Sequence, residues 1–192
     1  MAIIQLSTIL AGLLLVTAAP GFAENQRPAS KNGGDDSSWQ AMQSLIGQWD
    51  GDLGGQPGQA TGGSFTITSD LQGRALVRRS FAEFPATKDR PAFRHDDLTI
   101  VYQGAAGSAP RATYYDSEGH VIEYTVSVSS GGRRIEWLSA VRPAEPRFRF
   151  TYAFTSPTTM NVRFEIAPPG QPDKFTTHVE GSVRKAVTEP RR

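Results

Sequence analysis

Short segments in which apolar residues occupy every second position constrain the fold of this chain most strongly. In the segment 147–154, RFRFTYAF, four aromatic side chains fall on one face of an extended backbone. The segments 120–128 and 160–167 show the same period of two. Alternation with one apolar face is typical of half-buried strands in an antiparallel sheet. These segments therefore predict an all-β fold.

Segments of this kind recur along the chain, separated by turns rich in Gly, Pro, Asp and Ser. Their close spacing and short connections favour an up-and-down antiparallel β-barrel of about ten strands, because closure removes the exposed sheet edges. The expected strands are 48–53, 63–69, 74–84, 97–103, 111–115, 120–128, 135–141, 147–154, 160–167 and 174–185.

A short helix is expected just before the first strand. Residues 36–38, DSS, can cap it, and Trp39, Met42 and Leu45 follow at helical spacing. Gly47 is expected to end it. No other segment predicts a convincing helix.

The N-terminal region predicts export. Residues 1–23 form an apolar run that ends in small residues before Glu24, which is the pattern of a signal peptide cleaved after Ala23. The run is shorter than the roughly 20 residues of a spanning helix, so we expect a periplasmic or secreted protein without a stable membrane anchor; an uncleaved anchor is the alternative. The expected organisation is a disordered linker over 24–38, one barrel domain over 39–186 and a flexible tail over 187–192.

Composition excludes several classes of function. The formal net charge of +1 gives no basic field for nucleic acid. The chain contains no Cys, which excludes disulfides and cysteine-ligated metals. The three histidines, His95, His120 and His178, form no pair with metal-ligand spacing. We expect no metal site and a monomer or homodimer.

The stretch SLIGQWDG, a Gly-x-Trp at the start of the first strand after a short helix, resembles the calycin superfamily of lipocalins and fatty-acid-binding proteins. That resemblance implies that Trp49 closes one end of the barrel, that an Arg of the last strand packs across its ring, and that Gly47 allows close approach. Arg184 is the expected cation. The stretches LQGRALVRRSF and YYDSEGHVIEY look most like an uncharacterised family of secreted bacterial lipocalin-like proteins.

The resemblance implies that the barrel binds a small hydrophobic or amphipathic molecule, which can be anionic. Fatty-acid-binding relatives hold a ligand carboxylate with an inward Arg and a Tyr, and the candidates here are Arg149, Arg163, Tyr124 and Tyr152. Both Arg residues alternate with large apolar side chains, so a solvated outer face is the alternative for them. Of the neighbours Arg78 and Arg79, only one can point inward.

A second resemblance is to nitrobindins, barrels that hold haem through a His of the last strand. The stretch THVEGSVRK is similar to their closing strand, with His178 at the matching position. The Tyr-Pro loop of the nitrobindin first hairpin has no counterpart after GQWDGDLGG. Haem is therefore the alternative to a barrel without a cofactor.

No motif in the sequence unites residues for catalysis. RHDD at 94–97 reads as solvated charges at the entry to a strand, and DSEG at 116–119 reads as a hairpin turn in which Gly119 takes a positive φ. The alternatives to ligand binding are an enzyme that uses carboxylates in the cavity and a ligand-free structural or interaction domain.

Overall fold

The computed structural model describes residues 35–52, 60–104, 108–129 and 131–187. The predicted signal peptide, most of the predicted linker and most of the predicted tail lie outside this part of the chain. Helix α1 (Asp35–Gln43) begins within the predicted linker and ends before Gly47. The strands are β1 (Gly47–Asp52), β2 (Gly62–Asp70), β3 (Ala75–Phe84), β4 (Phe93–Tyr102), β5 (Arg111–Asp116), β6 (Val121–Val128), β7 (Arg134–Ser139), β8 (Arg147–Ser156), β9 (Thr159–Ala167) and β10 (Thr176–Lys185).

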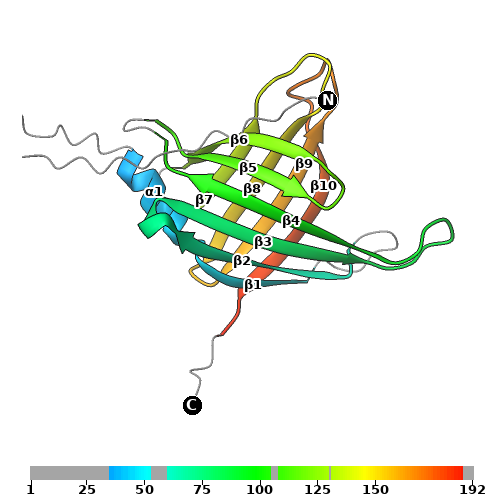
Figure 1. Cartoon of the computed structure of the whole chain (residues 1–192), viewed down its shortest axis with the longest axis horizontal. Coiled ribbons are helices and arrows are strands. Elements are labelled where there is room, and N and C mark those ends of the chain that lie inside the picture. Colours follow the sequence, from blue (N-terminus) through cyan, green and yellow to red (C-terminus); the bar gives the residue numbers. More distant parts are fainter. Residues whose placement is uncertain (1–34, 53–59, 105–107, 130, 188–192) are drawn as a thin grey trace, which may run out of the picture. The chain divides into compact units, whose positions relative to one another are not determined.

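The ten strands form one closed antiparallel barrel, which confirms the predicted fold class (Figure 1). Each strand pairs with the next along the chain, and β1 pairs with β10 to close the sheet. A single-turn 3-10 helix, η1 (Leu71–Gly73), joins β2 to β3. Within the described residues, no helix is long and apolar enough to cross a membrane.

Two strands differ most from the sequence prediction. Strand β4 starts at Phe93 because its hairpin with β3 stays in register from Ala75↔Tyr102 to Phe84↔Phe93. The RHDD residues are therefore strand residues and not an entry loop. In β10 a bulge between Thr177 and Val179 shifts the register, so the strict alternation expected for that strand does not hold.

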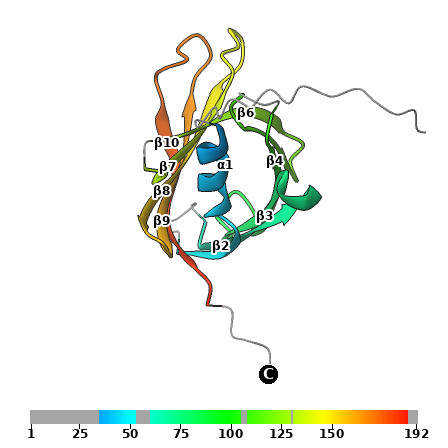
Figure 2. The same cartoon turned by 90° about the vertical axis from the view of Figure 1, so that its left-hand side faces the viewer.

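Helix α1 closes one end of the barrel, as Figure 2 shows. The side chains of Met42 and Leu45 are fully buried, and the Trp39 indole Nε1 donates a hydrogen bond of 2.9 Å to the Gly73 carbonyl. The short helix is stable here because its apolar side chains cover the barrel interior, since an isolated helix of this length is marginal in water.

Trp49 fills the interior beneath the helix. Its side chain is 0% exposed, and its Nε1 donates a hydrogen bond of 2.8 Å to the Leu45 carbonyl. The indole stacks on Phe65 with ring centroids 6.2 Å apart and meets Phe154 edge-on at 6.0 Å. Trp49 therefore joins the helix to the barrel core.

The cation across Trp49 is Lys185, and this corrects the expectation for Arg184. Lys185 is the register partner of Trp49, and its Nζ lies 5.3 Å from the indole centroid. Arg184 pairs with Asp50 and its side chain is exposed on the outer face. Successive strand residues point to opposite faces, so only one of these two neighbours can reach the indole.

Burial of the inner face changes along the barrel. On β9, Met160 and Val162 near α1 are buried, whereas Phe164 and Ile166 toward the other end are half-buried. The same change occurs on β6, where Tyr124 is buried and Ile122 is half-buried. We call the end away from α1 the mouth, defined by the half-buried inner-face residues Ser80, His95, Asp97, Tyr114, Ile122, Phe148, Phe150, Phe164, Ile166 and Val179.

Candidate binding site in the barrel mouth

An ion pair lies at the base of the mouth. Arg78 points inward from β3 between its register partners Ile67 and Thr99. Its guanidinium Nη1 pairs with the Asp97 carboxylate, and the two side chains are only 11% and 9% exposed. The Ser80 hydroxyl donates a second hydrogen bond to Asp97 at 2.5 Å. The pairing offsets the free energy of desolvation, which would be large for either charge buried alone.

Aromatic rings surround this guanidinium. The Arg78 Cζ lies 4.8 Å from the Phe65 ring centroid and 5.7 Å from that of Phe150. Phe150 in turn packs edge-on against Tyr152, with centroids 4.8 Å apart. Cation–π attraction adds to the ion pair where water is excluded, so Arg78 is held in one place.

Burial and charge set the protonation states at this depth. Burial lowers the pKa of Arg78, but interactions with Tyr152 and Asp97 outweigh it and raise this pKa above its ordinary value. Burial raises the pKa of Tyr152 to about 12, against an opposing effect of Arg78. Burial also raises the pKa values of Tyr114 and Tyr124 well above the usual range. The guanidinium is therefore charged, and the three phenols are neutral donors at physiological pH.

Several buried polar atoms at the same depth lack hydrogen-bond partners. Thr99 is the register partner of Arg78, and the Trp137 and Tyr152 rings lie 5.6 Å apart. Arg78 opposes the rise in the pKa of Tyr152 through its charge and through a hydrogen bond between the two side chains, so these two residues are in contact. The other buried atoms of the described residues without a hydrogen-bond partner, which we call the floor atoms, are sealed from solvent: Arg78 Nε, Thr99 Oγ1 and Trp137 Nε1.

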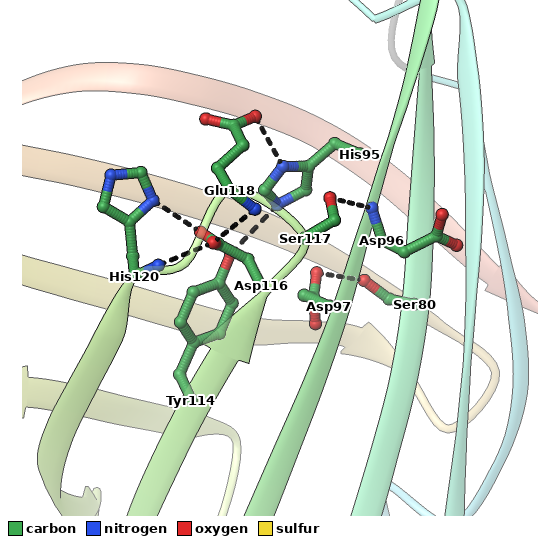
Figure 3. A network of polar contacts seen from close by, with 9 residues as sticks. All are labelled: Ser80, His95, Asp96, Asp97, Tyr114, Asp116, Ser117, Glu118 and His120. Carbon is green, nitrogen blue, oxygen red and sulfur yellow. Dashed lines mark hydrogen bonds and ion pairs between the residues drawn. The ribbon is translucent and has the colours of Figure 1, made fainter.

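A polar network forms the rim of the mouth on the β4–β5 side (Figure 3). The His95 Nε2 and the Tyr114 hydroxyl are 3.0 Å apart, and the Tyr114 hydroxyl donates to Asp116 at 3.2 Å. The other His95 nitrogen, Nδ1, lies 3.1 Å from Glu118. His120 places Nδ1 2.8 Å from the same Asp116 carboxylate.

Asp116 has this environment because it opens the β5–β6 turn. Burial raises its pKa, but hydrogen bonds from the backbone and side chain of His120 and from the Glu118 backbone outweigh burial and hold that pKa below its usual value. Gly119 takes φ 92° and completes the turn as expected. Asp116 is also the register partner of Asp97, so two carboxylates face each other across neighbouring strands.

A solvent-accessible groove lies on the outer face of the barrel, behind these groups. A groove of about 520 Å³ runs along the β2–β5 side and includes Ser80, Asp97 and Asp116 in its lining. Its remaining lining residues lie on the outer face of these strands or at the start of the β5–β6 turn, so the groove is separate from the mouth: Ser64, Thr66, Arg79, Phe81, Arg94, Asp96, Leu98, Tyr115 and Ser117.

The two predicted tyrosines are buried inside the barrel, whereas the two predicted arginines lie on the outer face. Arg149 forms a bidentate pair with Glu165, at 2.7 and 2.8 Å. Arg163 pairs with Glu180 at 2.6 Å. The alternation that places Phe148, Phe150 and Phe164 inside necessarily turns these arginines outward.

His178 is exposed at the β10 bulge, next to the mouth. Its ring meets the Phe164 ring edge-on, with centroids 6.0 Å apart. No observation tests haem ligation by this residue, which stays a prediction. Across the described residues, no group of three or more His, Asp or Glu side chains is placed to hold a metal ion.

Sequence reasoning left the main polar residues of this site unassigned. The strand of Arg78 alternates weakly, because apolar residues fall on both of its faces: Leu76 on one, Val77 and Phe81 on the other. Asp97 was expected in an exposed loop entry. The sequence indicated only that one of Arg78 and Arg79 points inward. The register of β3 with β2 and β4 shows that it is Arg78.

The barrel and the helix α1 that covers one of its ends together indicate the class of fold. A closed ten-stranded antiparallel β-barrel with one helix before the strands is consistent with a calycin-like fold. No protein-family model and no curated protein matches this sequence.

Proposed function

We propose that this protein is an exported calycin-like barrel that binds a small hydrophobic or amphipathic molecule in its mouth. The observation that carries the proposal is an inner face that is buried next to α1 but half-buried and mainly apolar at the mouth, above the buried pair of Arg78 and Asp97. An apolar concavity with a few polar anchors is the usual form of a small-molecule site.

The walls supply the apolar part of the site. Phe148 and Phe164 stack with centroids 6.0 Å apart, and Phe150 tilts against Phe164 at 6.3 Å. Ile122 faces the mouth from β6 and is half-buried. A ligand that covers such side chains removes apolar area from water, which stabilises the complex by roughly 25 cal/mol per Å² covered.

Two members of the rim network are poorly suited to act as general bases. A general base works best with a pKa near the operating pH. Tyr114 has its pKa raised far above that range, and Asp116 has its pKa lowered below its usual value. These two groups are suited to holding the β4–β5 edge in place and to donating or accepting fixed hydrogen bonds.

Binding of a neutral apolar probe tests the proposal. The full chain is titrated with phenylnaphthylamine, and fluorescence enhancement reports binding. We expect saturable binding to one site, weakened at least about tenfold in Phe164→Ala, because a wall ring of the mouth is lost. Arg163→Ala is the matched control, since its neighbouring side chain lies on the outer face. Absence of saturable binding, or equal loss in both variants, would contradict the proposal.

A further inference from the structure

The outer face of the barrel differs in character from one side to the other. On β8 to β10 it carries charges in pairs, Arg149 with Glu165 and Arg163 with Glu180. On β3 to β6 apolar side chains are exposed instead. Of the seven large hydrophobic residues that are exposed in the described part of the chain, four lie on this side: Ile100, Tyr102, Tyr115 and Val121.

The register makes these apolar side chains contiguous. Ile100 on β4 is the partner of Val77 on β3. In the next row Leu98 is the partner of Tyr115, which is in turn the partner of Val121 on β6. Directly opposite residues have Cβ atoms about 4.5–5.5 Å apart. We call this surface the outer patch, defined by Val77, Leu98, Ile100, Tyr102, Tyr115 and Val121.

A contiguous apolar patch of this kind indicates an interaction surface, whereas single exposed apolar residues are ordinary. The charges at its edges indicate what it binds. Arg79 lies on β3 at one edge, and Glu123 lies on β6 at the opposite edge. Both side chains are exposed, and neither belongs to an ion pair within the described residues. Arg111, the register partner of Tyr102, is a second cation at the border.

A second copy of the chain is complementary to this arrangement. In a twofold dimer both copies use the same surface, so each edge of the patch meets the opposite edge of the partner. With the axis running between β4 and β5, Arg79 faces the partner's Glu123 on both sides while the apolar centres meet. Arg and Glu side chains are longer than the apolar ones between them, so they can span the space that two convex barrels leave at the edges of a contact.

We propose that the protein forms a twofold homodimer through the outer patch, in which Arg79 of each copy pairs with the partner's Glu123. A lipid surface would cover the apolar residues as well, but anionic headgroups would repel Glu123. The outer patch lies on the opposite face of the sheet from the mouth residues. The dimer is therefore independent of the ligand binding proposed above.

Reversing the two charges tests the proposal. Sedimentation equilibrium of the full chain over a range of concentrations gives the dimer dissociation constant. Arg79→Glu and Glu123→Arg each place like charges opposite one another, so each should raise that constant at least about tenfold. The double variant restores opposite charges and should return to within about threefold of the wild type. Arg163→Glu, on the side with paired charges, is the matched control and should leave the constant unchanged.

Three results would overturn the proposal. The first is a wild type that stays monomeric at all concentrations; if this monomer co-sediments with phosphatidylcholine vesicles, the outer patch binds a lipid surface instead. The second is association that neither single reversal weakens, as expected if the apolar residues 1–23 drive it. The third is a double variant as weak as the single ones. If circular dichroism shows that a reversal variant is unfolded, Arg79→Ala and Glu123→Ala decide, and each should weaken the dimer several-fold.

Discussion

Lys185 stands opposite Trp49 across the β1–β10 seam, with its Nζ 5.3 Å from the indole centroid. The seam is where the barrel closes, so this pair fixes the first strand to the last. Gly47 lies at the same place: it has φ +133°, and a Cβ there would meet the aliphatic part of Lys185. The barrel is therefore closed at this seam by the Trp49 indole and the Lys185 side chain, and Gly47 leaves room for the lysine.

The Lys185 contact predicts a difference between two neighbouring cations. Lys185→Ala should lower the free energy of unfolding by roughly 0.5–2 kcal/mol, because the cation–π contact and the cover over Trp49 are lost. Arg184→Ala should change it by less than about 0.5 kcal/mol, since this side chain is exposed. Urea denaturation of both variants measures the difference. A larger loss for Arg184→Ala would mean that the arginine is the stabilising cation.

The backbone at Gly47 predicts a cost for any side chain there. Gly47→Ala should destabilise the protein by roughly 1–3 kcal/mol, because its φ is unfavourable for other residues. Gly62, also at a strand start, has open space around its Cβ position and no such φ. Gly62→Ala is therefore the control and should leave the thermal midpoint nearly unchanged. Equal midpoints for the two variants would show that the position tolerates a side chain.

The change in burial along β9 predicts that its inner-face residues differ in their contribution to stability. Met160 is 0% exposed near α1, so Met160→Ala should cost about 2–5 kcal/mol. Phe164 is half-buried at the mouth, and Phe164→Ala should cost less than that while weakening probe binding. Chemical denaturation, together with the probe titration, separates the two effects. A greater loss of stability from Phe164→Ala would mean that the mouth is packed as tightly as the helical end.

The outer ion pair of Arg149 and Glu165 predicts loss of stability in acid. The hydrogen bonds from Arg149 outweigh burial and hold the pKa of Glu165 below the ordinary 4.5. A carboxylate whose pKa is lowered on folding contributes stability that is complete above its unfolded pKa and is lost as the pH falls through the folded pKa. The unfolding free energy of the wild type should therefore decrease on acidification below about pH 4.5.

Two substitutions isolate this contribution. Glu165→Gln removes the titrating carboxylate, so it should flatten part of the decline in acid. It should also lower the free energy of unfolding at neutral pH by about 1–2 kcal/mol, a modest amount because the bidentate pair is only partly shielded from water. Glu180→Gln breaks the exposed pair with Arg163 and should do neither to a measurable extent. Identical pH profiles for the wild type and Glu165→Gln would rule out this carboxylate as a source of acid sensitivity.

The strands were predictable wherever one face was clearly apolar. In 147–154 and 160–167 the alternation gave both the strands and the faces that turn inward, and the structure agrees at Phe150, Tyr152 and Val162. The closed ten-stranded topology followed from short turns and from the need to remove sheet edges. Local sequence carries this information because a period of two is a property of each strand by itself.

The site was not predictable in the same way. Arg78 and Arg79 are neighbours of equal chemistry, and only the pairing of β3 with β2 and β4 turns Arg78 inward. The bulge in β10 removes the face that alternation assigned to His178. The amino-acid sequence determined which segments become strands and which apolar faces they bury. The tertiary structure alone decided which charges lie inside the barrel, because a one-residue change of register moves a side chain from solvent to interior, and register depends on contacts between distant segments.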